Sequence, residues 1–159
     1  MKALMPQECR LAFVYLTGVL YVAGPIYFLV VGEPVAAVFW LIGFPLAYRA
    51  YTRVFPSISQ LLGYGRVDDV PAPRVSPSSR AVTMYSSFGC PFCPIVEERL
   101  RALETEMGFD LEHVDVTLRP NLVREKKIRS VPVVEVDDRR LVGHATTREL
   151  AELIKGAHP

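Results

Sequence analysis

The chain has 159 residues, half of them hydrophobic, and a formal net charge of +1 at pH 7. For this length, such an apolar composition indicates one small domain together with a lipid-facing segment. The near-neutral charge gives no sign of nucleic-acid binding. Three cysteines are too few for the disulfide framework of a small secreted domain.

Two apolar runs near the N-terminus predict a helical hairpin in a membrane. Residues 11–31 carry no charge, and a helix of about 20 apolar residues crosses the hydrocarbon core of a bilayer. Residues 35–52 supply about 18 more if the Arg49 side chain extends to the interface. The alternatives are a cleaved signal peptide for the first run and a re-entrant or interfacial segment for the second.

The charges around the hairpin predict its orientation. Basic residues flank the open end of the hairpin: Lys2 and Arg10 precede the first run, Arg49 lies near the end of the second, and Arg53 and Arg66 follow it. The turn between the runs carries only Glu33. Because positive loops stay on the cytoplasmic side, we expect a two-span membrane protein with both termini in the cytoplasm. In that reducing compartment a Cys-x-x-Cys pair is more often catalytic than structural.

We expect three segments: a membrane hairpin over residues 1–55, a linker rich in proline and serine over residues 56–79, and a soluble domain over residues 80–159. Within the last segment, hydrophobic periodicity and turn residues predict strands and helices in the order βαβαββα. The strands are expected at 81–86, 111–116, 131–136 and 141–143, and the helices from about 91 to 107, at 120–128 and from Thr146. This order predicts an α/β domain with a mixed four-stranded sheet and helices on both faces.

Cys90 and Cys93 lie at the turn between the first of these strands and its helix. Proline favours the first helical position, so Pro91 predicts that the helix starts there. Cys90 would then face the positive end of the helix dipole, which stabilises a thiolate. Cys93 is placed to attack a mixed disulfide formed on Cys90. A zinc site needs four ligands and no second pair exists, while an inert structural pair is the other alternative.

From Ala81 to Ile154 the chain resembles the glutaredoxins of the thioredoxin-fold superfamily. Three features carry the resemblance: Tyr85-Ser86 before the Cys90-Pro91-Phe92-Cys93 motif, Ser130-Val131-Pro132 at the third strand, and Gly143 after the hairpin. The resemblance implies a cis Pro132 that faces the thiols, and a Val131 backbone that pairs with a substrate strand. It also implies that Cys90 attacks, that Cys93 resolves, and that Phe92 helps to form an apolar rim for substrate.

The departures from the family concern glutathione. Ser87 occupies the position where glutathione-binding members usually have lysine, and no carboxylate follows Gly143 until Glu149. A site without these charged partners should bind glutathione weakly. We therefore expect no tightly bound cofactor, and we keep glutathione as an alternative electron source beside thioredoxin reductase.

Two further residues have open roles. His144 could approach the thiols and tune their pKa, although we expect a solvated loop histidine. Cys9 could be a lipidation site or a third redox thiol, although we expect an unreactive cysteine.

The sequence thus predicts a membrane-anchored thiol–disulfide oxidoreductase that reduces protein disulfides at the cytoplasmic membrane face. Its expected partners are disulfide substrates, membrane proteins among them, together with a reductase and the lipid bilayer. The alternatives are an iron–sulfur cluster shared by two subunits, and an interaction module that has kept the fold without the chemistry.

Overall fold

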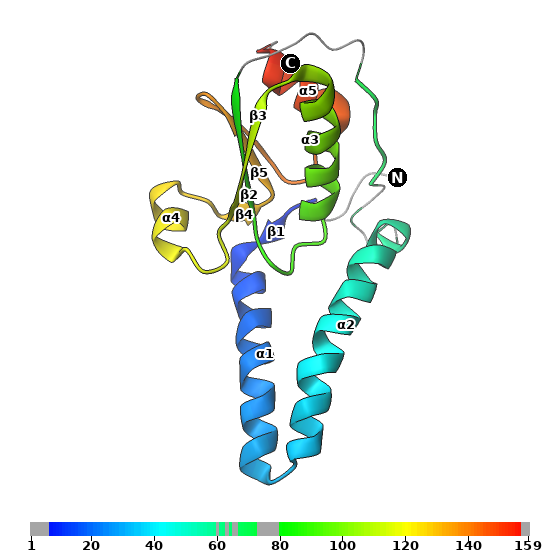
Figure 1. Ribbon diagram of the computed structural model, residues 1–159, viewed down its shortest axis with the longest axis vertical. Helices are drawn as coiled ribbons and strands as arrows, with labels where there is room; N and C mark the ends of the chain where they lie inside the picture. Colours follow the sequence, from blue (N-terminus) through cyan, green and yellow to red (C-terminus); the bar gives the residue numbers. More distant parts are fainter. Residues whose placement is uncertain (1–6, 60, 63, 65–66, 73–79, 157–159) are drawn as a thin grey trace.

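The computed structural model describes residues 7–59, 61–62, 64, 67–72 and 80–156 (Figure 1). Two long helices form a hairpin at one end of the molecule, and an α/β domain lies at the other end (Figure 1). Lys2, Arg66 and residues 73–79 of the expected linker lie outside the described residues.

The hairpin consists of α1 (Leu11–Val31) and α2 (Pro34–Ile58). Gly32 ends α1 in the left-handed conformation with φ +85°, which glycine adopts without a Cβ penalty. Pro34 is the first residue of α2, so the turn between the two helices consists of Gly32 and Glu33. Both helices are long and apolar enough to cross a membrane, and most of their side chains are exposed. α2 runs past residue 52, where the second span was expected to end.

Aromatic side chains hold the two helices together. The ring centroids of Tyr21 in α1 and Phe44 in α2 lie 5.2 Å apart, and those of Phe28 in α1 and Trp40 in α2 lie 6.0 Å apart. Gly24 faces Trp40 so closely that a Cβ there would lie 2.5 Å from the indole ring. The missing side chain at position 24 therefore allows the helices to approach at this level.

The domain contains a mixed four-stranded sheet in the order β3-β2-β5-β6. The strands are β2 (Ala81–Ser86), β3 (Asp110–Asp115), β5 (Val133–Val136) and β6 (Arg139–Val142). β2 is parallel to β3 and antiparallel to β5, and β5 is antiparallel to β6. The predicted order of elements along the chain and the predicted fold class are confirmed. The expected strand 131–136 is interrupted at Pro132, which has no N–H to donate, and its first part becomes the separate β4 (Ser130–Val131).

Three helices cover this sheet. α3 (Cys93–Met107) and α5 (Thr147–Lys155) lie on one side and the short α4 (Pro120–Glu125) lies on the other (Figure 1). The predicted inner face of α3 is fully buried and consists of Val96, Leu100, Leu103 and Met107. α5 starts, as expected, after Thr146 and has a capping box there, in which the Thr146 side chain accepts from the Glu149 N–H and the Glu149 side chain accepts from the Thr146 N–H.

The hairpin and the domain share part of one core. Leu11 at the start of α1 and Phe55 near the end of α2 belong to the buried cluster of the domain. Tyr64, Val67 and Ala72, from the described part of the expected linker, pack against the same cluster. A short strand before α1, β1 (Cys9–Arg10), pairs with β4 in the domain. α2 also continues past residue 55, the expected boundary of the hairpin.

Candidate active site

The loop after β2 presents the two thiols toward the helical hairpin. Gly89 turns this loop with φ +92°, and a Cβ on it would lie 3.7 Å from Thr17 in α1. The Phe88 ring lies 5.0 Å from the ring of Tyr48 in α2. Thr117 holds the loop from the other side, since its Oγ1 accepts from the Phe88 N–H at 2.8 Å. The thiol loop is therefore fixed between the hairpin and the end of β3.

α3 begins at Cys93, so the predicted helix start at Pro91 is wrong. Pro94 gives the physical reason, because it has no N–H to donate to the Cys90 carbonyl, as a helix starting at residue 91 would require. The first helical bond instead runs from the Val96 N–H to the Phe92 carbonyl at 3.1 Å. Cys90 thus lies three residues before the helix rather than at its first turn.

Cys90 lies beside the cis bond between Val131 and Pro132. Its Sγ donates to the Val131 carbonyl at 3.6 Å. The two motifs, which are about forty residues apart in the sequence, therefore meet at one point of the fold. Cys93 lies near this point as well, close enough to Cys90 to affect the pKa of its thiol.

The environment of Cys90 disfavours the thiolate in this conformation. The residue is 1% exposed, and burial raises the pKa of its thiol. The neighbouring Cys93 thiol also raises this pKa, while a hydrogen bond from Cys9 opposes the rise. This corrects the expectation that a helix N-terminus lowers the pKa of Cys90. The thiol has to become more exposed before it can act as a nucleophile.

Phe92 does not form an open rim in this conformation. It is 1% exposed, and its ring packs edge-on against Phe55 at 4.9 Å and Tyr64 at 5.6 Å. The side chain expected to meet substrate therefore holds the end of α2 against the domain. The sequence could not reveal this contact, because its three residues lie in three separate segments.

His144 is half-buried rather than solvated. The side chain of Arg99 lies 2.7 Å from its Nε2, and its ring centroid lies 6.4 Å from that of Phe92. Burial lowers the pKa of His144, and the positive charge of Arg99 lowers it further. The ring therefore lies between Arg99 and Phe92 and not in solvent.

The structure also shows a feature that sequence reasoning missed, which is the strand β1 across the thiol site. Cys9 pairs with Val131 and Arg10 with Ser130 in antiparallel register. Two further backbone hydrogen bonds flank these pairs. The His144 N–H donates to the Gln7 carbonyl at 2.7 Å, and the Leu11 N–H donates to the Arg129 carbonyl at 3.2 Å. A strand of two residues has no periodicity by which the sequence could reveal it.

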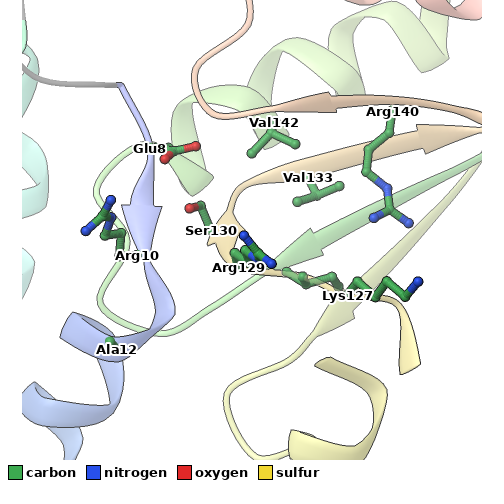
Figure 2. A pocket seen from close by; sticks show the side chains of 10 residues that line it. Glu8, Arg10, Ala12, Lys127, Arg129, Ser130, Val133, Arg140 and Val142 are labelled. Carbon is green, nitrogen blue, oxygen red and sulfur yellow. The ribbon is translucent and has the colours of Figure 1, made fainter. Parts of the chain in front are cut away.

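Two cavities border β1. One of about 350 Å³ opens between the hairpin and the thiol loop and includes Cys9, Phe13, Tyr51 and Phe92 in its lining. The other, of about 570 Å³, lies over β1 and β4 and has basic side chains around it, namely Arg10, Lys127, Arg129 and Arg140 (Figure 2). Across the part of the chain that the structure describes, no group of three or more His, Cys, Asp or Glu residues is arranged to hold a metal ion.

Residues 81–155 match the glutaredoxin-like domain family (DUF836). No curated protein shows significant sequence similarity to the chain.

Among solved structures, a mutant of the alkylhydroperoxide reductase component AhpF from Enterococcus faecalis is 24% identical over 65% of this chain, with a TM-score of 0.49. The match covers 53% of that protein, so this chain spans about half of its length. Thioredoxin-2 of a malaria parasite is 17% identical over 56% of this chain and 99% of its own, with a TM-score of 0.46. A mutant thioredoxin from Halobacterium salinarum is 16% identical over 57% and 96%, with a TM-score of 0.45.

Proposed function

We propose that this protein, whose residues 81–155 form a glutaredoxin-like domain of the thioredoxin fold, is a membrane-anchored thiol–disulfide oxidoreductase. The family of the domain points to a redox-related function. The observation that carries the specific proposal is the position of Cys90, with its Sγ 3.6 Å from the Val131 carbonyl and Cys93 as its neighbour. A dithiol beside a backbone edge that can pair with a peptide strand is the arrangement that disulfide exchange with a protein requires.

The proposed reaction is the reduction of a protein disulfide. The Cys90 thiolate attacks one sulfur of the substrate, forms a mixed disulfide and releases the other substrate sulfur as a thiolate. Cys93 then attacks Cys90, which forms the Cys90–Cys93 disulfide and releases the second substrate thiol. The substrate gains two electrons and two protons, and the protein loses them. An external reductase, either thioredoxin reductase or the glutathione system, restores the dithiol.

The membrane anchor is supported by the exposure of the hairpin. α1 and α2 present apolar side chains to their surroundings along most of their lengths, which is unfavourable in water. The basic residues at the open end of the hairpin, Arg10, Arg49 and Arg53, support a cytoplasmic location for the domain. The proposed substrates are therefore protein disulfides at the cytoplasmic membrane face.

The function can be tested with the full-length protein in detergent, because Phe55 and Leu11 of the hairpin help to form the core of the domain. Reduction of insulin disulfides is measured with NADPH and either thioredoxin reductase or glutathione with its reductase. We expect turnover with one of these sources and its loss in Cys90→Ser. In the double variant Cys9→Ser/Cys93→Ala, which keeps Cys90 as its single cysteine, we expect a mixed disulfide with the substrate to accumulate.

A second measurement covers the case in which insulin is too large for the site. The protein is equilibrated in buffers of oxidised and reduced dithiothreitol, and its disulfides are mapped by alkylation and mass spectrometry. A reversible Cys90–Cys93 disulfide supports the proposal. Its absence at every potential, together with inactivity toward insulin, would overturn the proposal.

The orientation needs a separate test. Alkaline phosphatase and green fluorescent protein are fused in turn after Pro159. Fluorescence without phosphatase activity is expected for a cytoplasmic domain, and the reverse pattern would contradict the orientation. Extraction of the protein by alkaline carbonate would contradict the anchor itself.

A further inference from the structure

β1 occupies the backbone edge at which a peptide substrate would pair. Cys9 is aligned with Val131, the residue whose carbonyl also accepts from the Cys90 thiol. Gly143 allows the segment to lie there, because a Cβ at this position would be 2.7 Å from the Gln7 carbonyl oxygen. Any larger residue at position 143 would therefore collide with the backbone of the N-terminal segment.

This pairing brings a third thiol to the site. The Cys9 side chain lies close enough to Cys90 for the two thiols to affect each other's pKa. Cys9 lines the apolar cavity together with Gly89 and Pro91, which flank Cys90. All three cysteines are free thiols in this structure. The register thus places one cysteine of β1 where the reactive cysteine of a bound substrate strand would lie.

We propose that β1 is a built-in substrate strand and that Cys9 exchanges disulfides with Cys90. This inference rests on the proposed function, since it uses the same nucleophile. It assigns Cys9 a redox role, in place of the unreactive cysteine that the sequence led us to expect.

The exchange is an isomerisation and needs no outside oxidant. In the oxidised protein, the Cys9 thiolate attacks the Cys90 sulfur of the Cys90–Cys93 disulfide. A Cys9–Cys90 bond forms, the Cys90–Cys93 bond breaks, and Cys93 leaves as a thiolate that takes up the proton lost by Cys9. The number of disulfides stays at one. The disulfide that first lay within the domain now links the domain to the segment that leads into α1.

The arrangement has a consequence for outside substrates. Cys9 is tied to the domain through α1 and α2, so its effective concentration at Cys90 is in the millimolar range or above. A substrate strand has to displace β1 from Val131 before it can pair there. The same segment therefore acts as a redox partner of Cys90 and as a competitor of external disulfides.

The test uses full-length Cys93→Ser in detergent, which retains only Cys9 and Cys90. The protein is treated with one equivalent of diamide and its disulfides are mapped by proteolysis and mass spectrometry without reduction. We expect an intramolecular Cys9–Cys90 disulfide whose yield does not depend on protein concentration. Only intermolecular disulfides, or none, would overturn the proposal.

A matched control moves the thiol by one residue. Successive side chains of a strand point to opposite sides, so a thiol at position 10 should face away from Cys90. In the triple variant Cys9→Ser/Arg10→Cys/Cys93→Ser we expect the rate of intramolecular disulfide formation to fall at least about tenfold. An equal rate would show that flexibility of the segment, rather than the β1 register, brings the thiols together, and would overturn the proposal.

The two proposals fail in different ways. Cys9→Ser lacks the third thiol but keeps the dithiol, so the Cys90–Cys93 disulfide and insulin reduction should persist in it. Loss of both in Cys9→Ser, while Cys93→Ser still forms the Cys9–Cys90 bond, would contradict the proposed function alone. Intact insulin reduction without any Cys9–Cys90 bond in Cys93→Ser would contradict the role of Cys9 alone.

Discussion

The hairpin and the domain use the same kinds of apolar residue in opposite ways. In the hairpin, Val30 is 80% exposed and Phe39 is 74% exposed. In the domain, Val136 is fully buried, and Phe55 of α2 becomes fully buried where it enters the same core. Exposed apolar surface of this extent is unfavourable in water, and this difference between the two regions supports the proposed membrane anchor.

The comparison also shows where the two regions depend on each other. Leu11 and Phe55 lie at the open end of the hairpin and belong to the core of the domain. The thiol loop and β1 occupy the same boundary. The site therefore belongs to neither region alone, and a change in the position of the hairpin would alter access to Cys90.

The largest effect on stability is expected at Phe55. Phe55→Ala removes a fully buried ring from the contact with Phe92 and Tyr64, and large-to-small changes of this kind cost about 3–5 kcal/mol. The free energy of unfolding can be measured in urea and detergent through alkylation of Cys93, which is buried in the folded domain.

Phe39→Ala is the matched control, because it removes the same ring from an exposed position of the same helix. We expect it to change the urea midpoint of the domain little. Equal effects of the two substitutions would show that the hairpin does not contribute to the domain core.

A smaller effect is expected inside the hairpin at Gly24. A Cβ there would lie 2.5 Å from the Trp40 ring, so Gly24→Ala has to separate the helices at a cost of about 1–3 kcal/mol. Trp40 is the only tryptophan of the chain, and its emission spectrum in detergent reports the change directly. Gly18→Ala is the control, since a Cβ there meets nothing within 4 Å. An unchanged spectrum in Gly24→Ala would contradict the close approach.

The parts of the fold that depend on local signals could be predicted from the sequence. Apolar residues of α3 repeat at helical spacing from Val96 to Met107, and the capping box of α5 lies within four residues. Gly108 and Gly156 end these helices in the left-handed conformation, as the pattern indicates. Each of these features needs only neighbours in the chain, so a single sequence contains enough information.

The site was harder to predict because it depends on distant segments. The pairing of Cys9 with Val131 joins residues more than one hundred positions apart, and neither strand is longer than two residues. The pKa of Cys90 depends first on burial and also on Cys9, which lies far away in the sequence. The start of α3 was mispredicted for a local reason, since Pro94 has a stronger effect than Pro91.

The smallest effect is expected where the described part of the linker meets α5. Asp69 accepts from the Thr147 N–H at 2.8 Å and the Thr147 hydroxyl at 2.6 Å, and Arg99 lies 3.4 Å away. Partial burial raises the pKa of Asp69, but the bonds from Thr147 and the charge of Arg99 outweigh it and lower the pKa overall.

Because this folded-state pKa is depressed, the carboxylate stabilises the fold above its unfolded pKa of about 3.9, and the contribution is lost as the pH falls through the folded value. Asp69→Asn should cost less than about 1 kcal/mol at neutral pH, since the pair is partly exposed. The loss of stability between about pH 6 and pH 3 should also be smaller in this variant than in the wild type. Asp138→Asn, in the exposed turn between β5 and β6, is the control and should follow the wild type. An acid response of Asp69→Asn identical to that of the wild type would show that this contact does not fasten the linker to the domain.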